Sequence, residues 1–369
     1  MTAQSSTNIP LLFTPTKLRG LEIRNRIMAS PMCQYHSDDG GPNDWHMMHL
    51  GRLAIGGCGI VFGEETAVEP DGRKTHSCAG LYNQSHIAAY RRLTDMIKQH
   101  GAVPAIQLGH SGRKGSCHGA IEDWRPLTAK DAKDGLPPWQ IMTPSAAISP
   151  PRPIPPKEMD QDDIKRVIEA FRTATKRSID AGYDIVEIHG AHGYLIHQFL
   201  SSSANQRDDT YGGSLENRLR YPLEIFDAVK AVVPADMPVL VRVSASDWVD
   251  GGWDVEQTIV FARALDAVGC ASLHVSSGGN SLAQKINIGY GYQTDLAKQI
   301  RDEVAMPIIA VGMITDPVQA ETIIRTGQAD MVALAREFLR DPHWTWRAAK
   351  ALRATSSVPP QYQRAVSFD

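Results

Sequence analysis

Residues 160–190, "DQDDIKRVIEAFRTATKRSIDAGYDIVEIHG", contain one complete helix-and-strand unit. The apolar residues of its first part fall along one stripe of a helix, at Ile164, Val167, Ile168, Phe171 and Ile179. Asp160 is a favourable helix N-cap, and Gly182 marks the end of the helical pattern. The run that follows, "YDIVEIHG" (183–190), is almost continuously apolar. Such a run is typical of a strand covered on both faces in a parallel sheet.

The same unit repeats along the chain. The predicted strands are 26–32, 59–65, 103–110, 183–190, 238–246, 271–279, 307–314 and 330–337. Helical patterns accompany them at 86–100, 160–181, 216–233, 255–268, 293–304, 316–326 and 343–352. This alternation of strand and helix predicts an α/β fold, a (β/α)8 TIM barrel.

One long interruption breaks this rhythm. Residues 111–158 are rich in proline, glycine and charged residues and show no sustained period. Because the segment follows the third predicted strand, we expect a capping insertion over the mouth of the barrel. The polar start of the chain, residues 1–10, is expected to be a flexible tail, and residues 11–369 are expected to form a single domain.

Composition excludes several classes of protein. The chain has 369 residues, 42% of them hydrophobic and 21% charged, with a formal net charge of −3. This balance argues against disorder and against nucleic acid or an anionic membrane as a partner. The five cysteines are scattered, without a C-x-x-C pair, which argues against a zinc, iron–sulfur or disulfide framework. With no secretory signal and no membrane-spanning run, the sequence predicts a cytoplasmic protein.

Glycines and an arginine follow the last three predicted strands, where the chemistry of a barrel gathers. Backbone N–H groups at such glycines, together with a guanidinium, predict a phosphate pocket. The residues are Ser277, Gly278, Gly312 and Arg336. The simpler alternative is that these glycines only turn the chain.

Two further polar residues stand in the predicted strands. Arg242 lies in an apolar strand, where its charge is costly unless an anion meets it. A structural salt bridge is the commoner reason for such an arginine, and a cofactor anion at the barrel axis is the alternative. Gln107 offers a donor and an acceptor together, as an amide-like ring edge requires. A phosphate pocket, a fixed cation and an amide suggest a cofactor such as FMN.

Several motifs occur in order over residues from about 11 to about 364, and they resemble the Old Yellow Enzyme family. These are FMN-dependent ene-reductases, and the chain is most similar to their bacterial, thermophilic-like branch. The most specific motifs are "HGAHGYL" (189–195) and "YGGSLENR" (211–218). The others are "NRIMASPMCQY" (25–35), "QLGHSGRK" (107–114), "VRVSASD" (241–247), "AVGMIT" (310–315) and "ALAREFLRDP" (333–342). The resemblance implies FMN as the cofactor and NADPH or NADH as the reductant.

The resemblance also assigns roles in cofactor binding. The residues along the flavin edge would be Ser30, Pro31, Met32 and Cys33. Cys33 would tune the flavin potential and the fit of the substrate. Gln107 matches the partner of the flavin pyrimidine, and Arg242 matches the arginine beside N1 and the C2 carbonyl. Gly312, Ala335 and Arg336 match the phosphate site.

Two residues depart from the family pattern. Ala335 replaces a common glycine in the phosphate turn, where its methyl group would crowd the loop slightly. Glu65 stands where relatives usually have a small residue whose backbone touches the flavin. A carboxylate there would lower the reduction potential of a ring that becomes anionic.

His189, His192 and Tyr194 are the catalytic residues that the resemblance implies. The two imidazoles would bind the substrate carbonyl and stabilise a developing enolate, as an oxyanion hole does. Hydride would pass from NAD(P)H through FMN to the β-carbon of an enone, enal, maleimide or nitroalkene, while Tyr194 protonates the α-carbon. Tyr35 resembles a substrate-contacting residue, and Cys33 is not expected to act as a covalent nucleophile. His197 is expected to be structural, and no metal site is expected.

The C-terminal tail, 353–369, resembles this branch through "PPQYQRAV" (359–366). Arg364 would reach the active site of a neighbouring subunit, which implies a homodimer or homotetramer. A solvated tail arginine is the alternative.

Three other functions stay open at this point. One is a larger flavin barrel with an iron–sulfur centre, acting on dienoyl thioesters or amines. Another is a flavin-free hydrolase or lyase that holds a metal on His189, His192 and Glu65. The third is a non-catalytic flavin store or sensor.

Overall fold

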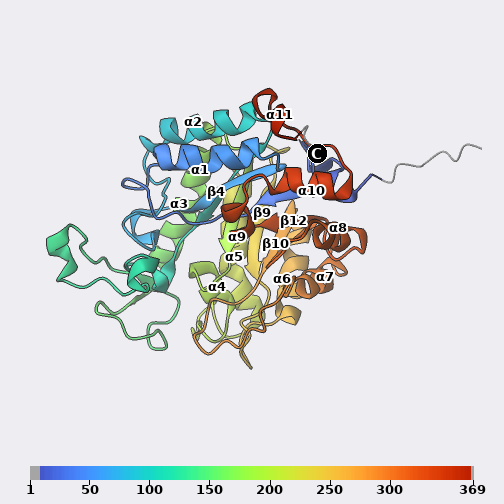
Figure 1. Ribbon diagram of the computed structural model, residues 1–369. Coiled ribbons are helices and arrows are strands. Elements are labelled where there is room, and N and C mark those ends of the chain that lie inside the picture. Colours follow the sequence, from blue (N-terminus) through green and yellow to red (C-terminus); the bar gives the residue numbers. More distant parts are fainter. Residues whose placement is uncertain (1–8, 367–369) are drawn as a thin grey trace, which may run out of the picture.

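Eight parallel strands close into a barrel, which confirms the predicted (β/α)8 fold. The computed structural model describes residues 9–366 (Figure 1). The barrel strands are β3 (Ile27–Ala29), β4 (Ile60–Ala67), β5 (Val103–Gly109), β8 (Ile185–Gly190), β9 (Val239–Ser244), β10 (Ser272–Ser276), β11 (Ile308–Val311) and β12 (Met331–Leu334). Each strand pairs with the next along the chain, and β12 pairs with β3. Nearly all of their residues are buried, which explains the continuous apolar runs in the sequence.

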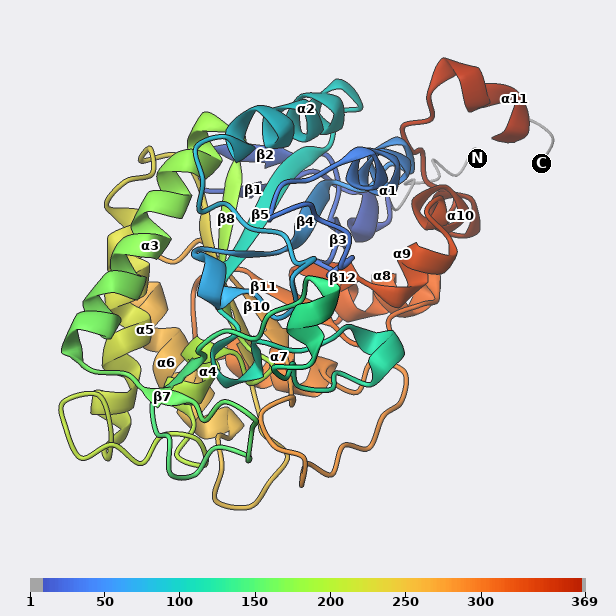
Figure 2. The same ribbon diagram turned by 90° about the vertical axis from the view of Figure 1, so that its left-hand side faces the viewer.

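The helices form a ring around the barrel (Figure 2). They are α1 (Asp44–Ile55), α2 (His86–Gln99), α3 (Gln161–Asp180), α4 (Leu195–Leu200), α5 (Leu215–Lys230), α6 (Val255–Ala267), α7 (Thr294–Arg301), α8 (Pro317–Arg325), α9 (Arg336–Arg340), α10 (Trp344–Leu352) and α11 (Gln363–Val366). The predicted cap of α3 is confirmed, since the Asp160 side chain accepts hydrogen bonds from the N–H groups of Asp162 and Asp163. The sequence pattern missed α1, whose buried face includes His46 and His49 in place of apolar residues.

A short hairpin covers the end of the barrel at which the strands begin. It consists of β1 (Thr16–Leu18) and β2 (Leu21–Ile23), and it leads directly into β3. Leu18 and Ile23 pack in one buried cluster with side chains of the barrel interior, including Ile60. With this end filled, the carboxyl ends of the strands remain as the open mouth.

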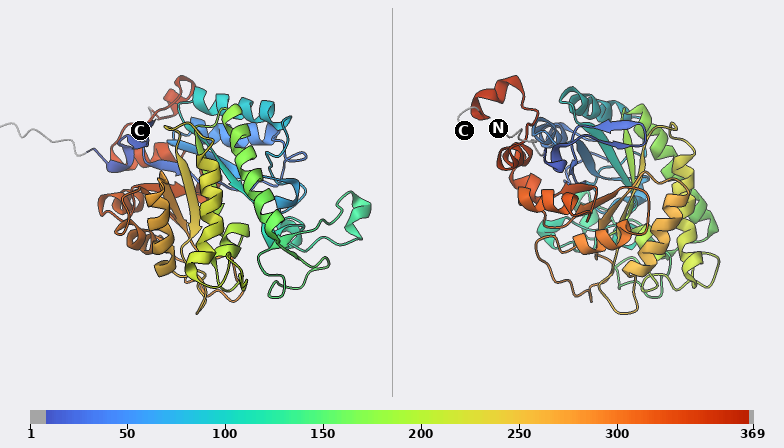
Figure 3. Two further views of the ribbon diagram at one scale, coloured as in Figure 1. Left: turned by 180° about the vertical axis from the view of Figure 1, so that it is seen from behind. Right: turned by 90° about the vertical axis from the view of Figure 1, so that its right-hand side faces the viewer.

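The segment 111–158 contains only short elements. They are η3 (Gly112–Lys114), η4 (Ala120–Glu122), η5 (Asp131–Asp134), β6 (Met142–Thr143) and β7 (Lys157–Glu158). The last two pair with each other, and the middle of the segment projects from the body of the protein (Figures 1 and 3). At the other end of the chain, α11 extends beyond α10 (Figure 2). Within residues 9–366, no helix is both long and apolar enough to cross a bilayer.

The tail expected over residues 1–10 falls mostly on residues 1–8, which lie outside the described part of the chain.

Candidate active site

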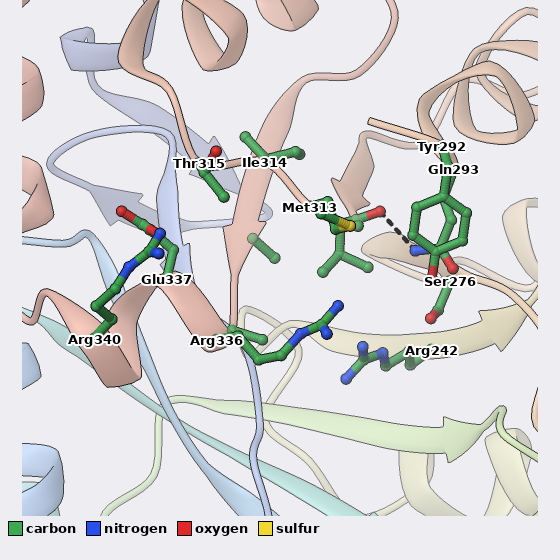
Figure 4. Close-up of a pocket in the computed structure, with 14 residues that line it drawn as sticks. Arg242, Ser276, Tyr292, Gln293, Met313, Ile314, Thr315, Arg336, Glu337 and Arg340 are labelled. Atoms are coloured by element: carbon green, nitrogen blue, oxygen red, sulfur yellow. Dashed lines mark hydrogen bonds and ion pairs between the residues drawn. The ribbon is translucent and has the colours of Figure 1, made fainter. Parts of the chain in front are cut away.

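A cavity of about 350 Å³ opens between the ends of β9 to β12. Four residues predicted from the sequence to bind a cofactor line it: Arg242, Gly312, Ala335 and Arg336. The guanidinium groups of Arg242 and Arg336 both extend into this space (Figure 4). Gly312 has φ +125°, and Ala335 directly precedes the first turn of α9. The arrangement of two cations beside a helix start fits a bound phosphate and an anionic ring.

Arg242 is buried and has no ion-pair partner among the residues that the structure describes. Only 7% of the residue is exposed, and its Nε has no hydrogen-bond partner within residues 9–366. Burial lowers the pKa of Arg242, and the electrostatic effect of Glu187 opposes this change. Glu187 does not pair with it directly, because the two carboxylate oxygens contact Gln107 and His274. Within residues 9–366, Arg242 therefore forms no structural salt bridge. A buried cation in this position fits an anionic ligand.

The Glu187 carboxylate fixes the orientation of Gln107. The Gln107 Nε2 donates a hydrogen bond to Glu187 Oε1 at 2.6 Å, and His274 Nδ1 lies 3.0 Å from Glu187 Oε2. All three side chains are essentially buried inside the barrel. With one N–H of its amide held in this way, Gln107 has its carbonyl oxygen and its second N–H left for a cofactor ring.

Three rings meet beside this cavity. The ring centroids of His189 and His192 are 5.1 Å apart, and those of His189 and Tyr194 are 4.9 Å apart. The Nδ1 of His189 is buried without a hydrogen-bond partner in the described residues, and His192 Nε2 lies 2.8 Å from Ser276 Oγ. Burial first, and then Arg242, hold the pKa values of both imidazoles well below the usual range, so the rings are neutral donors. Burial raises the pKa of Tyr194, which keeps its phenol protonated.

The turn that carries these rings is held by close backbone contacts. His192 has φ +58°, and its N–H donates to Ser244 Oγ at 2.9 Å. Gly193 packs against the loop after β10, and a Cβ added there would lie 2.7 Å from the Cα of Asn280. A Cβ added at Gly279 would likewise lie 2.7 Å from the Cα of His192. Both positions therefore require glycine.

His197 lies in α4, directly after this turn, and supports it, as expected of a structural histidine. Its Nδ1 accepts a hydrogen bond from the N–H of Gly193 at 2.9 Å, and its Nε2 lies 3.0 Å from Asp247 Oδ1. His197 and Asp247 are completely buried. Burial alone would raise the pKa of Asp247, but the contacts with His197 and Ser201 outweigh it and leave that pKa below its ordinary value.

We expect Asp247→Asn to reduce the free energy of unfolding by about 3 kcal/mol at neutral pH, because it removes the buried carboxylate that contacts His197 and Ser201. The depressed pKa of Asp247 means that its stabilisation is complete above the unfolded-state pKa of about 4 and is lost as the pH falls below it. Urea unfolding at neutral and acidic pH measures this, and the difference between the two proteins should shrink in acid. The control is Asp184→Asn, which removes a half-exposed pair with Lys98 and should cost less than about 1 kcal/mol. Equal midpoints for Asp247→Asn and the natural protein would contradict the assignment.

The predicted flavin-edge segment lies at the end of β3. The Ser30 hydroxyl is buried without a partner in the described chain, and Pro31 is also buried, while Met32 and Cys33 are partly exposed. Glu64 holds the segment, because its carboxylate accepts a hydrogen bond from Gln34 N–H at 2.9 Å. Burial first, and then Glu64 and Glu65, raise the pKa of the Cys33 thiol. A protonated thiol agrees with the expectation that Cys33 is not a nucleophile.

Tyr35 lies just beyond this segment, with φ +53°, and its ring packs edge-on against Trp124 of the segment 111–158. Glu65, at the end of β4, is buried beside it. Tyr35 and Glu65 are both close enough to Tyr194 to raise its pKa.

Of the residues predicted for the phosphate pocket, Ser277 and Gly278 do not line the cavity. The Ser277 hydroxyl donates to Gln293 Oε1 at 2.6 Å, and the N–H of Gly278 donates to the carbonyl of Ser246. Their neighbour Ser276 lines it instead. Other residues at the mouth were missed because nothing in their local sequence marks them: Lys74, Lys114, Trp124, Tyr292 and Gln293. Within the described chain, no three His, Cys, Asp or Glu residues are grouped to hold a metal ion.

Comparison with known proteins gives matches over almost the whole chain. The family model of the NADH:flavin oxidoreductase / NADH oxidase family matches residues 11–355. A NADPH dehydrogenase of Geobacillus sp. (strain WCH70) is 42% identical over 360 residues, covering 97% of this chain and 99% of the relative. Morphinone reductase has a similar structure, with a TM-score of 0.76 and 27% identity over 97% of this chain and 94% of that one.

A 2-naphthoyl-CoA reductase, solved as its complex with 2-naphthoyl-CoA, aligns with a TM-score of 0.83 and 26% identity. The alignment covers 92% of this chain and 52% of that one, so this chain spans about half the length of that reductase. The family match and the identity to the NADPH dehydrogenase agree with the cavity and the ring cluster at the barrel mouth. This chain belongs to the NADH:flavin oxidoreductase / NADH oxidase family and is an oxidoreductase.

Proposed function

We propose that this protein is an FMN-dependent ene-reductase. The observation that carries the proposal is Arg242, a buried cation without an ion-pair partner in the described chain. It lines the cavity that Arg336 also lines, and it acts electrostatically on His189 and His192. FMN supplies both negative charges that this site requires, one on its phosphate and one on its reduced ring. When bound, FMN takes hydride from NADPH or NADH and gives it to the β-carbon of an alkene conjugated to a carbonyl or nitro group.

Residues on several strands would hold the cofactor. Arg336, Gly312 and Ala335 would bind the phosphate, and Arg242 would neutralise charge on the ring. Gln107 would bind the pyrimidine edge through the amide groups that Glu187 leaves available. Ser30 to Cys33 would run along the ring edge, with Glu65 beside it, while Ser277 and Gly278 would support the site through Gln293 and Ser246.

The ring cluster would act on the substrate. His189 and His192 are neutral, so each offers one N–H to the substrate oxygen without adding a charge. Tyr194, whose pKa burial raises, would donate its proton to the α-carbon. Tyr35, which is close enough to Tyr194 to raise its pKa, would also contact the substrate. Enones, enals, maleimides and nitroalkenes all have the oxygen acceptor that this arrangement requires.

The C-terminal tail supports a proposal about assembly. Arg364 lies in α11, which extends beyond α10, and residues 361–366 are all exposed (Figure 2). We propose that the tail, 353–369, reaches a neighbouring subunit of a homodimer or homotetramer and places Arg364 at its active site.

Anaerobic spectroscopy of the purified protein tests the function. We expect a yellow protein whose flavin absorbance bleaches with NADPH or NADH and returns when an enone is added. Release of riboflavin, or bleaching without reoxidation by any activated alkene, would contradict the proposal. A colourless protein that needs a metal for activity would support the hydrolase instead.

Arg336→Ala should weaken FMN binding about 10²-fold, because charged hydrogen bonds to the phosphate are lost. Fluorescence titration of the flavin-free protein with FMN and with riboflavin measures this loss. Riboflavin, which lacks the phosphate, should bind both proteins equally. The matched control is Arg340→Ala, since Arg340 lines the same cavity but pairs with Glu337. If FMN and riboflavin bind the natural protein equally, the phosphate site is misplaced.

A further inference from the structure

Two ionisable side chains at the mouth, an acid and a base, have no hydrogen-bond partner in the described chain. Glu65 is 3% exposed, and neither of its carboxylate oxygens meets a donor within residues 9–366. The Lys74 Nζ lies 3.1 Å from the ring centroid of Trp124 and 5.9 Å from that of Tyr35. Over the same residues, the Lys74 ammonium donates to no oxygen. A buried carboxyl group and a nearby cation that both lack hydrogen-bond partners within residues 9–366 indicate a polar ligand.

The strands leave room for the Glu65 carboxyl group. Glu65 pairs in register with Gln107, whose side chain points into the barrel, so Glu65 faces the same interior. Gly109, two residues after Gln107, lies beside the Glu65 carboxyl group, and a Cβ at that position would collide with it. Glu64 differs, because its carboxylate is already occupied by Gln34 N–H and His46. The Glu65 carboxyl group therefore has room inside the barrel, but it has no hydrogen-bond partner within residues 9–366.

The charge state of this region favours an anionic ligand. Burial first, and then Glu64, raise the pKa of Glu65 and Lys74 lowers it, which leaves that pKa at about 8. At neutral pH the carboxyl group is therefore mostly protonated and can donate. The titratable groups that interact with it are Cys33, Tyr35, Glu64, Lys74, Cys78 and Tyr194. Lys114, a second cation nearby, already donates to the carbonyls of His192 and Gly279. Lys74 is therefore the cation left for a ligand.

We propose that the alkene reduced by this enzyme carries a carboxylate, which the Lys74 ammonium and the Glu65 carboxyl group bind together. The proposal rests on the proposed function, since the activating oxygen of the same molecule would bind His189 and His192. The Tyr35 and Trp124 rings beside Lys74 would enclose the part of the substrate between its two polar ends.

Binding of two matched phenols tests this proposal. A phenolate oxygen takes the place of the substrate oxygen on the imidazole pair, and its charge-transfer absorbance with oxidised flavin reports binding without turnover. We expect the flavin-loaded protein to bind 4-hydroxybenzoate about tenfold more tightly than 4-hydroxybenzamide at neutral pH, since a charged hydrogen bond distinguishes them. Lys74→Met should bring the ratio of the two Kd values to about one. Lys130→Met changes an exposed lysine of the segment 111–158 and should leave the ratio as it is.

Variants of Glu65 test whether its carboxyl group binds the ligand as a hydrogen-bond donor or repels it as an ionised carboxylate. Glu65→Gln keeps a donor and should retain the preference for 4-hydroxybenzoate, whereas Glu65→Ala should reduce it severalfold. Tighter binding of 4-hydroxybenzoate by Glu65→Gln would show that the carboxylate repels the ligand, which overturns its assigned role. The flavin content of each variant confirms that the comparison is made on folded, loaded protein.

The failure of this inference is distinguishable from the failure of the proposed function. If no phenol produces a charge-transfer band in flavin-loaded protein and no alkene is reduced, the proposed function is wrong. If both phenols bind equally well and alkenes are still reduced, only the carboxylate site is wrong.

Discussion

Tyr194→Phe should slow the reduction of cyclohexenone by about 10²-fold or more while the reduction of the flavin by NADPH keeps its rate. The phenol is 7% exposed and its pKa is raised by burial, so it stays protonated and available as a donor. Loss of a positioned general acid typically costs 10²–10⁴-fold. The first half-reaction needs no proton from Tyr194. Anaerobic stopped-flow recording of flavin absorbance separates the two half-reactions.

The matched control is Tyr211→Phe. Tyr211 donates its hydroxyl hydrogen to Glu224 on α5, and its ring packs against Phe199 and Tyr221, so neither half-reaction should change. If Tyr194→Phe slows both half-reactions equally, the residue positions ligands in general and does not supply the proton. Because its pKa stays above neutrality, the alkene reaction should also show no titration of Tyr194 between weakly acidic and weakly alkaline pH.

His192→Ala should slow the reduction of an enone by about 10²-fold, because one donor to the developing enolate is lost. The same change should weaken phenol binding, measured by the charge-transfer absorbance of oxidised flavin. His192→Asn retains an N–H donor and should recover most of both losses. His192 Nε2 also lies 2.8 Å from Ser276 Oγ. Comparison of the alanine and asparagine variants distinguishes this structural contact from donation to the substrate.

Equal effects of alanine and asparagine at position 192 would mean that the shape of the imidazole matters and its N–H does not. A pH-dependent loss of the natural activity near the ordinary histidine pKa would also contradict the assignment. Burial and Arg242 lower the pKa values of both imidazoles, so the two rings stay neutral at pH values well below the ordinary histidine pKa.

The barrel could be predicted because parallel strands buried on both faces leave continuous apolar runs. The run 183–190 became β8, Ile185–Gly190, with only its ends displaced. The hairpin of β1 and β2 could not be predicted, since strands of three residues have no period to detect. α1 was missed because buried histidines interrupt its apolar stripe.

In the site, the sequence revealed residues that are unusual where they stand. A charge inside an apolar strand marked Arg242, and the structure places it in the cavity with Arg336. Contacts between distant segments left no local signal. Glu187 meets Gln107 because β8 pairs with β5 in this register, and it meets His274 from β10 inside the barrel.

Lys74 meets Trp124 only because the segment 111–158 brings Trp124 beside the loop that follows β4. Glu65 was noticed as a departure from the family pattern, but its lack of a partner is visible only in three dimensions.

The contact between Gly193 and Gly279 limits which segments can be exchanged between relatives. The turns after β8 and β10 come from strands that are not neighbours, yet each leaves no space for a side chain on the other. A chimera that takes one turn from a relative with a larger residue at its contact point would displace His192. The two turns must therefore be exchanged together, as a single module, in any recombination between members of this family.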